Sequence, residues 1–251
     1  MLQRTSYRPC GHLARLLDSS DNFVNFAIPM VLHVASNRIN AMRKPKAPEA
    51  NRARILAAAT AAFAALGYDG ASMDAIAAGT QTTRALINYY FGGKEQVYLA
   101  VLEQVYAEIR EAERALALDH LAPAKAIRRI VEFTFDYYLS HQYFVRIVIA
   151  ENQAKGRYLK KSKAMRTLNR PIVDLLSRVI ARGQADGSFR AGVDPVDVHM
   201  AIAALGNFNV SHQHTFATIF QREMGTQGDV PGRRAVVTDM ILSYLTKGGR
   251  A

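Results

Sequence analysis

Apolar positions recur with helical spacing along most of the chain after residue 48. The first such stretch runs from Glu49 to Leu66, and Gly67 follows it as a stop signal. The same spacing predicts a long helix that begins at Lys94, a helix opened by Pro123, and further helices over residues 141–151, 168–180, 194–220 and 235–245. Pro171 predicts a kink or a new helix start. Alternating strand patterns of useful length are missing, so we predict an all-α fold.

Between the first stretch and Lys94, the pattern breaks into two short helices. Ser72 is a good N-cap for a helix over residues 73–78, and Thr82 or Thr83 can cap a second helix that ends near Tyr90. Two short helices joined by a tight turn are typical of a helix-turn-helix. We therefore predict a small N-terminal helix-turn-helix domain over residues 47–94 and a larger helical bundle over residues 95–251.

Residues 1–46 need a separate interpretation. We expect a poorly ordered extension, or a start assigned too early upstream of Met42, because the helical pattern becomes strong only afterwards. A basic start followed by the apolar stretch 23–35 leaves a weak secretory signal as the alternative. That stretch is too short to span a bilayer, so we expect no membrane partner.

Composition and charge narrow the class of protein. The 251 residues are 49% apolar and 21% charged, which is typical of a folded globular chain. The formal net charge of +11 suits a polyanionic partner. Cys10 is the single cysteine, so an intramolecular disulfide is excluded and a reducing cytoplasm is the expected compartment.

The second short helix carries the chemistry of a DNA-reading helix. Thr83, Arg84 and Ala85 occupy its first turn, and Asn88 lies one turn further on the same face as Arg84. Arginine can bind guanine with two hydrogen bonds and asparagine can do so with adenine, each contributing about 1–3 kcal/mol of discrimination.

The run ASMDAIA at residues 71–77, followed by TRALINYYF at residues 83–91 and by Lys94-Glu95, resembles the DNA-binding signature of the TetR family, and the similarity covers about residues 49–100. The resemblance implies a transcriptional regulator, most often a repressor, that binds a pseudo-palindromic operator in double-stranded DNA as a homodimer and is released by a small-molecule effector. The DNA-binding residues that we predict are Arg52, Arg54, Ser72, Met73, Thr82, Thr83, Arg84, Ala85, Asn88, Tyr89, Tyr90 and Lys94.

Within that set, the resemblance assigns Thr83, Arg84 and Asn88 to the groove, and Tyr89, Tyr90 and Lys94 to backbone phosphates. The two tyrosines have an alternative as core aromatics, which is the interpretation that we adopt for Phe91. The basic run Arg43, Lys44 and Lys46 is either a DNA-contacting arm or a solvated tail.

Two positions depart from the family pattern. Gln81 stands in the turn where the family usually has glycine, so the turn can have a different shape. Gly93 stands where a serine or asparagine commonly caps the next helix, which removes a side-chain cap that contributes about 1 kcal/mol.

The resemblance also implies that residues 95–251 bind the ligand and dimerise, with the last two helical segments, 194–220 and 235–245, at the dimer interface. The stretch 206–220 is similar to the same part of TetR-type regulators of pyrimidine and related nitrogen-heterocycle catabolism. This resemblance implies a small polar effector, and aromatic compounds belong to that class. The ligand-binding residues that we predict are Phe135, Tyr138, Phe144, Arg146, Asn152 and Asn207, for each of which simple packing is the alternative.

The sequence lacks the residue patterns that catalysis, cofactor binding or metal binding would require. We find no nucleophile with a base, no paired carboxylates and no complete Walker motif around Gly92-Gly93-Lys94, so we predict that the chain is not an enzyme and needs no cofactor. His199, His212 and His214 do not make a metal site, because residues two apart on a helix point in different directions. A ligand-free architectural DNA-binding protein and a transcriptional activator of the same fold remain the alternatives.

Overall fold

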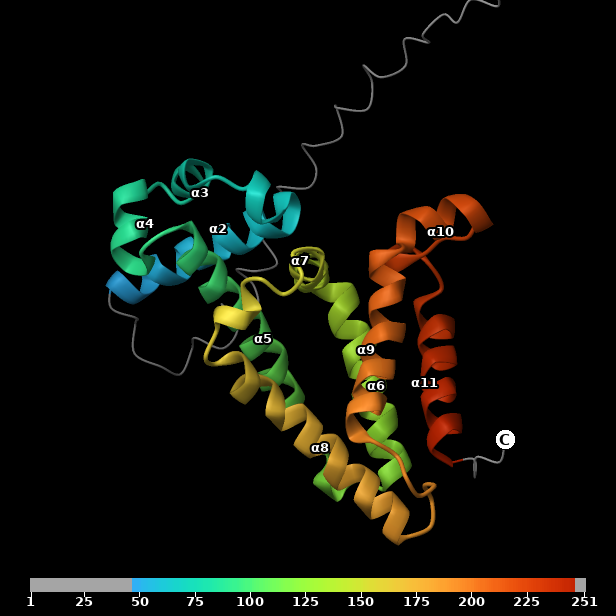
Figure 1. Ribbon diagram of the computed structural model, residues 1–251. Coiled ribbons are helices and arrows are strands. Elements are labelled where there is room, and N and C mark those ends of the chain that lie inside the picture. Colours follow the sequence, from blue (N-terminus) through green and yellow to red (C-terminus); the bar gives the residue numbers. More distant parts are fainter. Residues whose placement is uncertain (1–46, 247–251) are drawn as a thin grey trace, which may run out of the picture. The chain divides into compact units, whose positions relative to one another are not determined.

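The computed structural model describes residues 47–246, and their regular secondary structure is entirely helical (Figure 1). The predicted all-α fold is therefore confirmed. Our predictions for residues 1–46, with Cys10, Met42 and the basic run at 43–46, lie outside the described residues.

The described α-helices are α2 (Ala47–Gly70), α3 (Met73–Gly79), α4 (Arg84–Phe91), α5 (Lys94–Arg114), α6 (Pro123–Ser140), α7 (Gln142–Gln153), α8 (Met165–Ala185), α9 (Pro195–Ser211), α10 (Gln213–Phe220) and α11 (Val230–Thr246). Short 3₁₀ turns lie at Leu118–His120, Leu159–Lys161 and Gly225–Gln227.

Side-chain caps define the two short helices. The Ser72 hydroxyl accepts a hydrogen bond from the Ala75 amide at 3.0 Å, at the start of α3. The Thr83 hydroxyl accepts one from the Leu86 amide at 3.1 Å, at the start of α4. Of the two threonines considered from the sequence, Thr83 is therefore the cap.

The small N-terminal module is held by an apolar interior. Ile55 and Phe63 of α2, Ile76 of α3, Ile87 of α4 and Val97 of α5 are all buried. Buried side chains from each short helix thus fix that helix against the longer ones, which leaves the opposite faces of α3 and α4 in solvent.

Gly67 marks a break inside α2. Its φ of 68° and ψ of −178° lie outside the helical region, and helical structure resumes up to Gly70. Glycine adopts this left-handed φ at little steric cost. The predicted stop is therefore an interruption within the first helix.

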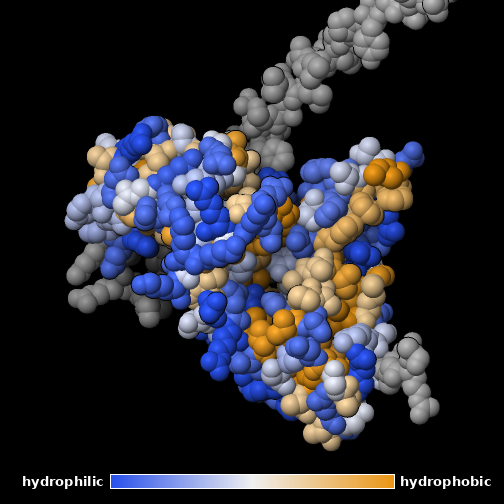
Figure 2. All heavy atoms as spheres, in the orientation of Figure 1, coloured by the Kyte–Doolittle hydropathy of each residue, from blue (hydrophilic) through white to orange (hydrophobic). Residues whose placement is uncertain are grey.

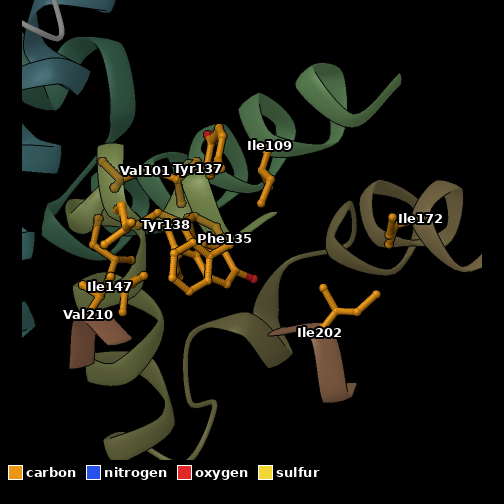
Figure 3. Packing of buried hydrophobic residues seen from close by; sticks show 14 of the residues in the cluster. Val101, Ile109, Phe135, Tyr137, Tyr138, Ile147, Ile172, Ile202 and Val210 are labelled. Carbon is orange, nitrogen blue, oxygen red and sulfur yellow. The ribbon is translucent and has the colours of Figure 1, made fainter. Parts of the chain in front are cut away.

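The larger bundle is built around α6. This helix packs against α9, α11 and α8, while α5 packs along α8. Figure 3 shows Phe135 and Tyr138 of α6 in the interior together with Ile147 of α7, Ile202 and Val210 of α9. A Cβ atom at Gly206 would lie 3.2 Å from the Tyr138 ring, so the lack of a side chain lets α9 approach α6 closely.

Three sequence boundaries differ from the structure. The helix start considered at Pro171 is wrong, because α8 continues through this residue near its N-terminal end, where the proline removes only one donor. The segment 194–220 divides at His212, next to Ser211, whose hydroxyl donates to the Asn207 carbonyl and competes with the helical bonding. The last helix begins at Val230, earlier than predicted.

Candidate functional site

Helix α4 presents a polar face to solvent. Arg84, Ala85, Asn88 and Tyr89 are exposed, whereas Ile87 between them is buried. Tyr89 is 82% exposed, which is a large value for an aromatic side chain. The helix thus has one face in the core and the other open to a partner.

Arg84 is held only loosely. Its Nη1 lies 3.4 Å from Oδ2 of Asp74 on α3, and both side chains are mostly exposed. An exposed ion pair of this kind contributes about 0–1 kcal/mol. Arg84 can therefore exchange Asp74 for a base edge or a phosphate at low cost.

A shallow hollow of about 520 Å³ brings together predicted DNA-binding residues from the starts of α3 and α5 and from α4. Ser72, Arg84, Asn88 and Lys94 line it, beside Asp74. The Lys94 ammonium donates to the Asp69 carbonyl at 3.3 Å and lies 4.7 Å from the centre of the Tyr68 ring. These contacts position Lys94 at the rim where α5 begins.

The remaining predicted DNA-binding residues occupy varied positions. Met73 is 6% exposed and packs in the core of the module, although it is among the residues that line the hollow. Thr82 is half-buried, and its hydroxyl has no hydrogen-bond partner. The half-buried Tyr90 ring lies 5.5 Å from the Tyr89 ring, centre to centre. Arg52 and Arg54 are exposed on α2.

The departures at Gln81 and Gly93 have structural consequences. Gln81 has a φ of 51°, the left-handed conformation that favours glycine. The Gln81 amide donates to the Ala78 carbonyl and the Thr82 amide to that of Ala77, the hydrogen-bond pair of a Schellman motif. At Gly93, the Gln96 side-chain oxygen accepts from the Gly93 amide at 3.1 Å, which satisfies this backbone donor at the start of α5.

The predicted ligand-binding residues do not form one cluster. Phe135, Tyr138 and Phe144 are buried, and the Tyr138 and Phe144 rings stack with centres 5.6 Å apart. Asn152 is exposed and donates to the Val148 carbonyl of its own helix. Arg146 is half-buried on α7. The Asn207 side-chain oxygen is buried and has no hydrogen-bond partner.

The structure reveals a buried charged pair that the sequence analysis missed. Arg110 and Glu113 of α5 have side chains that are each 4% exposed, and Arg110 Nη1 lies 3.0 Å from Glu113 Oε2. Burial raises the pKa of the Glu113 carboxyl to about 7, against the opposing effect of the Arg110 charge. The signal was present in the sequence, since Glu113 follows Val105 and Ile109 at the four-residue spacing of the apolar face.

Polar groups on α5, α6 and α9 interact electrostatically with this pair. The pKa of His199 on α9 is lowered to about 4, mainly by burial and secondly by the Arg110 charge. This imidazole is therefore neutral near pH 7. Burial raises the pKa of Tyr106 on α5 and of Tyr138 on α6, and Arg110 opposes both shifts. We call Tyr106, Arg110, Glu113, Tyr138 and His199 the interior polar cluster.

A second buried carboxylate ties the bundle to the module. One Glu151 oxygen, on α7, accepts hydrogen bonds from the Tyr158 and Leu159 amides at 2.8 and 2.9 Å. The Tyr158 ring lies 4.3 Å from the Tyr68 ring of α2 and 5.0 Å from the Tyr98 ring of α5. The turn after α7 therefore packs directly on the module.

The last helices leave an apolar surface uncovered. Val196 and Met200 on α9, and Val236, Met240 and Tyr244 on α11, are exposed at four-residue spacing on two helices that contact each other. Figure 2 shows apolar surface over the C-terminal helices. A groove of about 460 Å³ between α9, α10 and the start of α11 adjoins this surface, with Phe208, Phe216 and Phe220 among its lining residues.

Over residues 47–246, no three His, Cys, Asp or Glu side chains are grouped to hold a metal ion. The His212 ring stacks on Phe208 and has no part in the interior polar cluster that His199 joins. Across the same residues, every helix is too short or too polar to cross a membrane.

A helix-turn-helix with an exposed polar second helix, joined to a larger helical bundle, defines a DNA-binding regulatory protein. Two family profiles match the chain, one described as bacterial regulatory proteins of the tetR family, at residues 55–101, and one as the tetracyclin repressor-like C-terminal domain, at residues 123–241. The chain belongs to the TetR family of transcriptional regulators. The predicted family is confirmed, and the family is one of regulators, not of enzymes.

Relatives and solved structures agree with this assignment. The HTH-type transcriptional repressor NicS of Pseudomonas putida is 33% identical over 204 residues, which cover 80% of this chain and 96% of NicS. The HTH-type transcriptional repressor SCO4008 of Streptomyces coelicolor is 28% identical, over 65% of this chain and 80% of that protein. A tetR-family regulator from Rhodococcus RHA1 has the same fold, with a TM-score of 0.63 at 18% identity over 79% of this chain and 98% of that structure.

Proposed function

We propose that this protein is a ligand-controlled transcriptional repressor that binds a pseudo-palindromic operator as a homodimer in the cytoplasm. Residues 47–94 read the DNA, and residues 95–251 bind the effector and dimerise. Two relatives that carry the name of repressor, NicS and SCO4008, support repression over activation. The observation that carries the proposal is the course of α5, which begins with Lys94 at the DNA-facing hollow and carries Arg110 and Glu113 inside the bundle.

DNA reading is assigned to the exposed face of α4. Arg84 and Asn88 lie on this face and reach base edges in the major groove, while Tyr89 and Lys94 contact phosphates on either side. Arg52 and Arg54 add phosphate contacts from α2. The caps at Ser72 and Thr83 hold the two short helices in the geometry that this requires.

Dimerisation is assigned to the apolar surface on α9 and α11. Met200, Met240 and Tyr244 are exposed on two helices that contact each other, and a second copy would cover them in a two-fold interface. Two reading helices would then be presented about 34 Å apart, in successive major grooves. A pseudo-palindromic operator follows from this symmetry.

Effector control is assigned to the connection between the bundle and the module. A ligand that binds the bundle in one conformation shifts α5 and the turn held by Glu151, and both contact the module through Tyr98 and Tyr158. The effector binds one conformation more tightly than the conformation that binds DNA. This difference in binding free energy sets how far the affinity for operator falls.

The test is a fluorescence-anisotropy titration of a duplex from the gene's own upstream region against a scrambled duplex, at two salt concentrations. Selective binding by the wild type, lost in Arg84→Ala with Tyr89→Ala and kept in the surface control Arg178→Ala of α8, supports the proposal. Equal weak binding to both duplexes would favour an architectural DNA-binding protein. Higher expression of a promoter fusion in the presence of the protein would show activation in place of repression.

A further inference from the structure

The interior polar cluster contains a buried cation that its neighbours do not satisfy. Arg110 is almost entirely buried, and its Nε and Nη1 atoms have no hydrogen-bond partner. A guanidinium carries five N–H donors, and burying unpaired donors and charge has a high free-energy cost. A ligand that supplied acceptors to these donors would lower this cost.

Glu113 is an incomplete partner for Arg110. Arg110 Nη1 and Glu113 Oε2 are 3.0 Å apart, yet neither atom is in a hydrogen bond with good geometry. The Glu113 pKa of about 7 means that near neutral pH a large fraction of this carboxyl is protonated and does not balance the Arg110 charge. His199 is neutral there and offers no negative charge. The cluster therefore has a net positive character.

The surroundings of Arg110 indicate the shape of the missing group. Tyr106 of α5 and Tyr138 of α6 lie close enough to Arg110 for its charge to affect their pKa values, and the Phe144 ring lies 5.4 Å from Tyr106 and 5.6 Å from Tyr138. Raised pKa values keep both tyrosine hydroxyls protonated, so they can donate hydrogen bonds to an anion. Aromatic walls beside a forked cation fit a flat ring that bears one carboxylate.

We propose that the Arg110 guanidinium is the recognition group for the carboxylate of a small aromatic monocarboxylic acid, with the Tyr106 and Tyr138 hydroxyls as further donors and Phe144 against the ring. A phosphate dianion is disfavoured because it would bring a second negative charge into a buried site where Arg110 is the single cation of the cluster. This inference rests on the proposed function, since it names the class of effector.

The test uses the full chain with benzoate as the probe and benzamide as a neutral probe of the same shape. At a 100-fold excess over its Kd, benzoate should raise the unfolding temperature by about 5 °C, and equal benzamide should raise it by under about 1 °C. Arg110→Lys keeps the charge and removes the fork, and should weaken benzoate binding at least about tenfold in calorimetry. The exposed Arg178→Lys on α8 should bind benzoate as the wild type does.

Glu113→Gln keeps the test decisive if Arg110 variants do not fold. Removing the neighbouring carboxylate should tighten benzoate binding about three- to tenfold at pH 8, where wild-type Glu113 is mostly ionised. Unchanged or weaker binding in Glu113→Gln, an equal response to benzoate and benzamide, or no response of the wild type to benzoate would each overturn the inference.

The DNA titration separates this inference from the proposed function. Selective operator binding without any benzoate response leaves the repressor standing and removes the carboxylate site. A benzoate response that depends on Arg110, without selective DNA binding, leaves the anion site standing and removes the repressor.

Discussion

The DNA-binding module and the bundle distribute their polar and apolar side chains in opposite ways. In the module, Arg84 and Asp74 are exposed and the interior is built from residues such as Phe63 and Ile87. The bundle buries Arg110 and Glu113, while apolar residues such as Met240 are exposed on its surface. This distribution of side chains indicates the kind of partner that each region can bind. Hydrated surface charges fit DNA, whereas buried charges and exposed apolar faces fit a small ligand and another protein chain.

The largest expected effect tests the module's half of this comparison. Arg84→Ala with Asn88→Ala should remove two base contacts in each subunit, on the order of 4–12 kcal/mol in the dimer if the contacts add, so that operator affinity falls to the nonspecific level. Anisotropy with specific and scrambled duplexes measures this loss. Arg170→Ala, at another exposed arginine, on α8, is the control. Retained selectivity in the double variant would show that α4 does not read the bases.

The next effect tests the exposed apolar face of the bundle. Met200→Glu with Met240→Glu should weaken dimerisation by at least about 4 kcal/mol, or roughly 1000-fold, because the carboxylates would be buried in the interface. Analytical ultracentrifugation measures the dimer fraction. Leu66→Glu, at an exposed apolar position of α2, controls for the added charge. A double variant that remains dimeric would place the interface elsewhere.

The buried carboxyl of Glu113 should affect stability with a defined pH dependence. Its pKa rises from an ordinary 4.5 to about 7 on folding, so the folded state binds more protons in this window and stability falls as pH rises through it. Between pH 4.5 and 7, the wild type should lose up to about 3 kcal/mol of unfolding free energy through this carboxyl, and Glu113→Gln should abolish that loss. Urea denaturation at several pH values measures it, with exposed Glu111→Gln as the control. Parallel pH profiles for wild type and Glu113→Gln would contradict the burial argument.

The smallest expected effect concerns the turn between α3 and α4, where Gln81 has a left-handed backbone conformation. Gln81→Gly should stabilise the protein by about 0.5–1 kcal/mol, because relief of the left-handed backbone exceeds the added chain entropy of glycine. Thermal unfolding measures the gain. Gln81→Ala keeps the strain and should show no such gain, and an equal rise in both variants would trace the effect to the loss of the glutamine side chain.

Local features of the module and of the bundle could be read from the sequence because they depend on neighbours along the chain. Ser72 as an N-cap and Pro195 at the start of α9 follow from the hydrogen-bonding capacity of single residues. The side-chain position of Met73 did not follow, because a residue next to a cap can point into the core or outward, and the packing of α3 decides between them.

The all-helical class, the helix-turn-helix and the polar face of α4 follow from the sequence, because helical periodicity and capping are properties of residues a few positions apart. The shared burial of Arg110 and Glu113 with Tyr138 and His199 depends on the packing of the bundle, since these side chains come from three different helices. Burial and the pKa values that depend on it arise from this long-range packing, which no local pattern specifies.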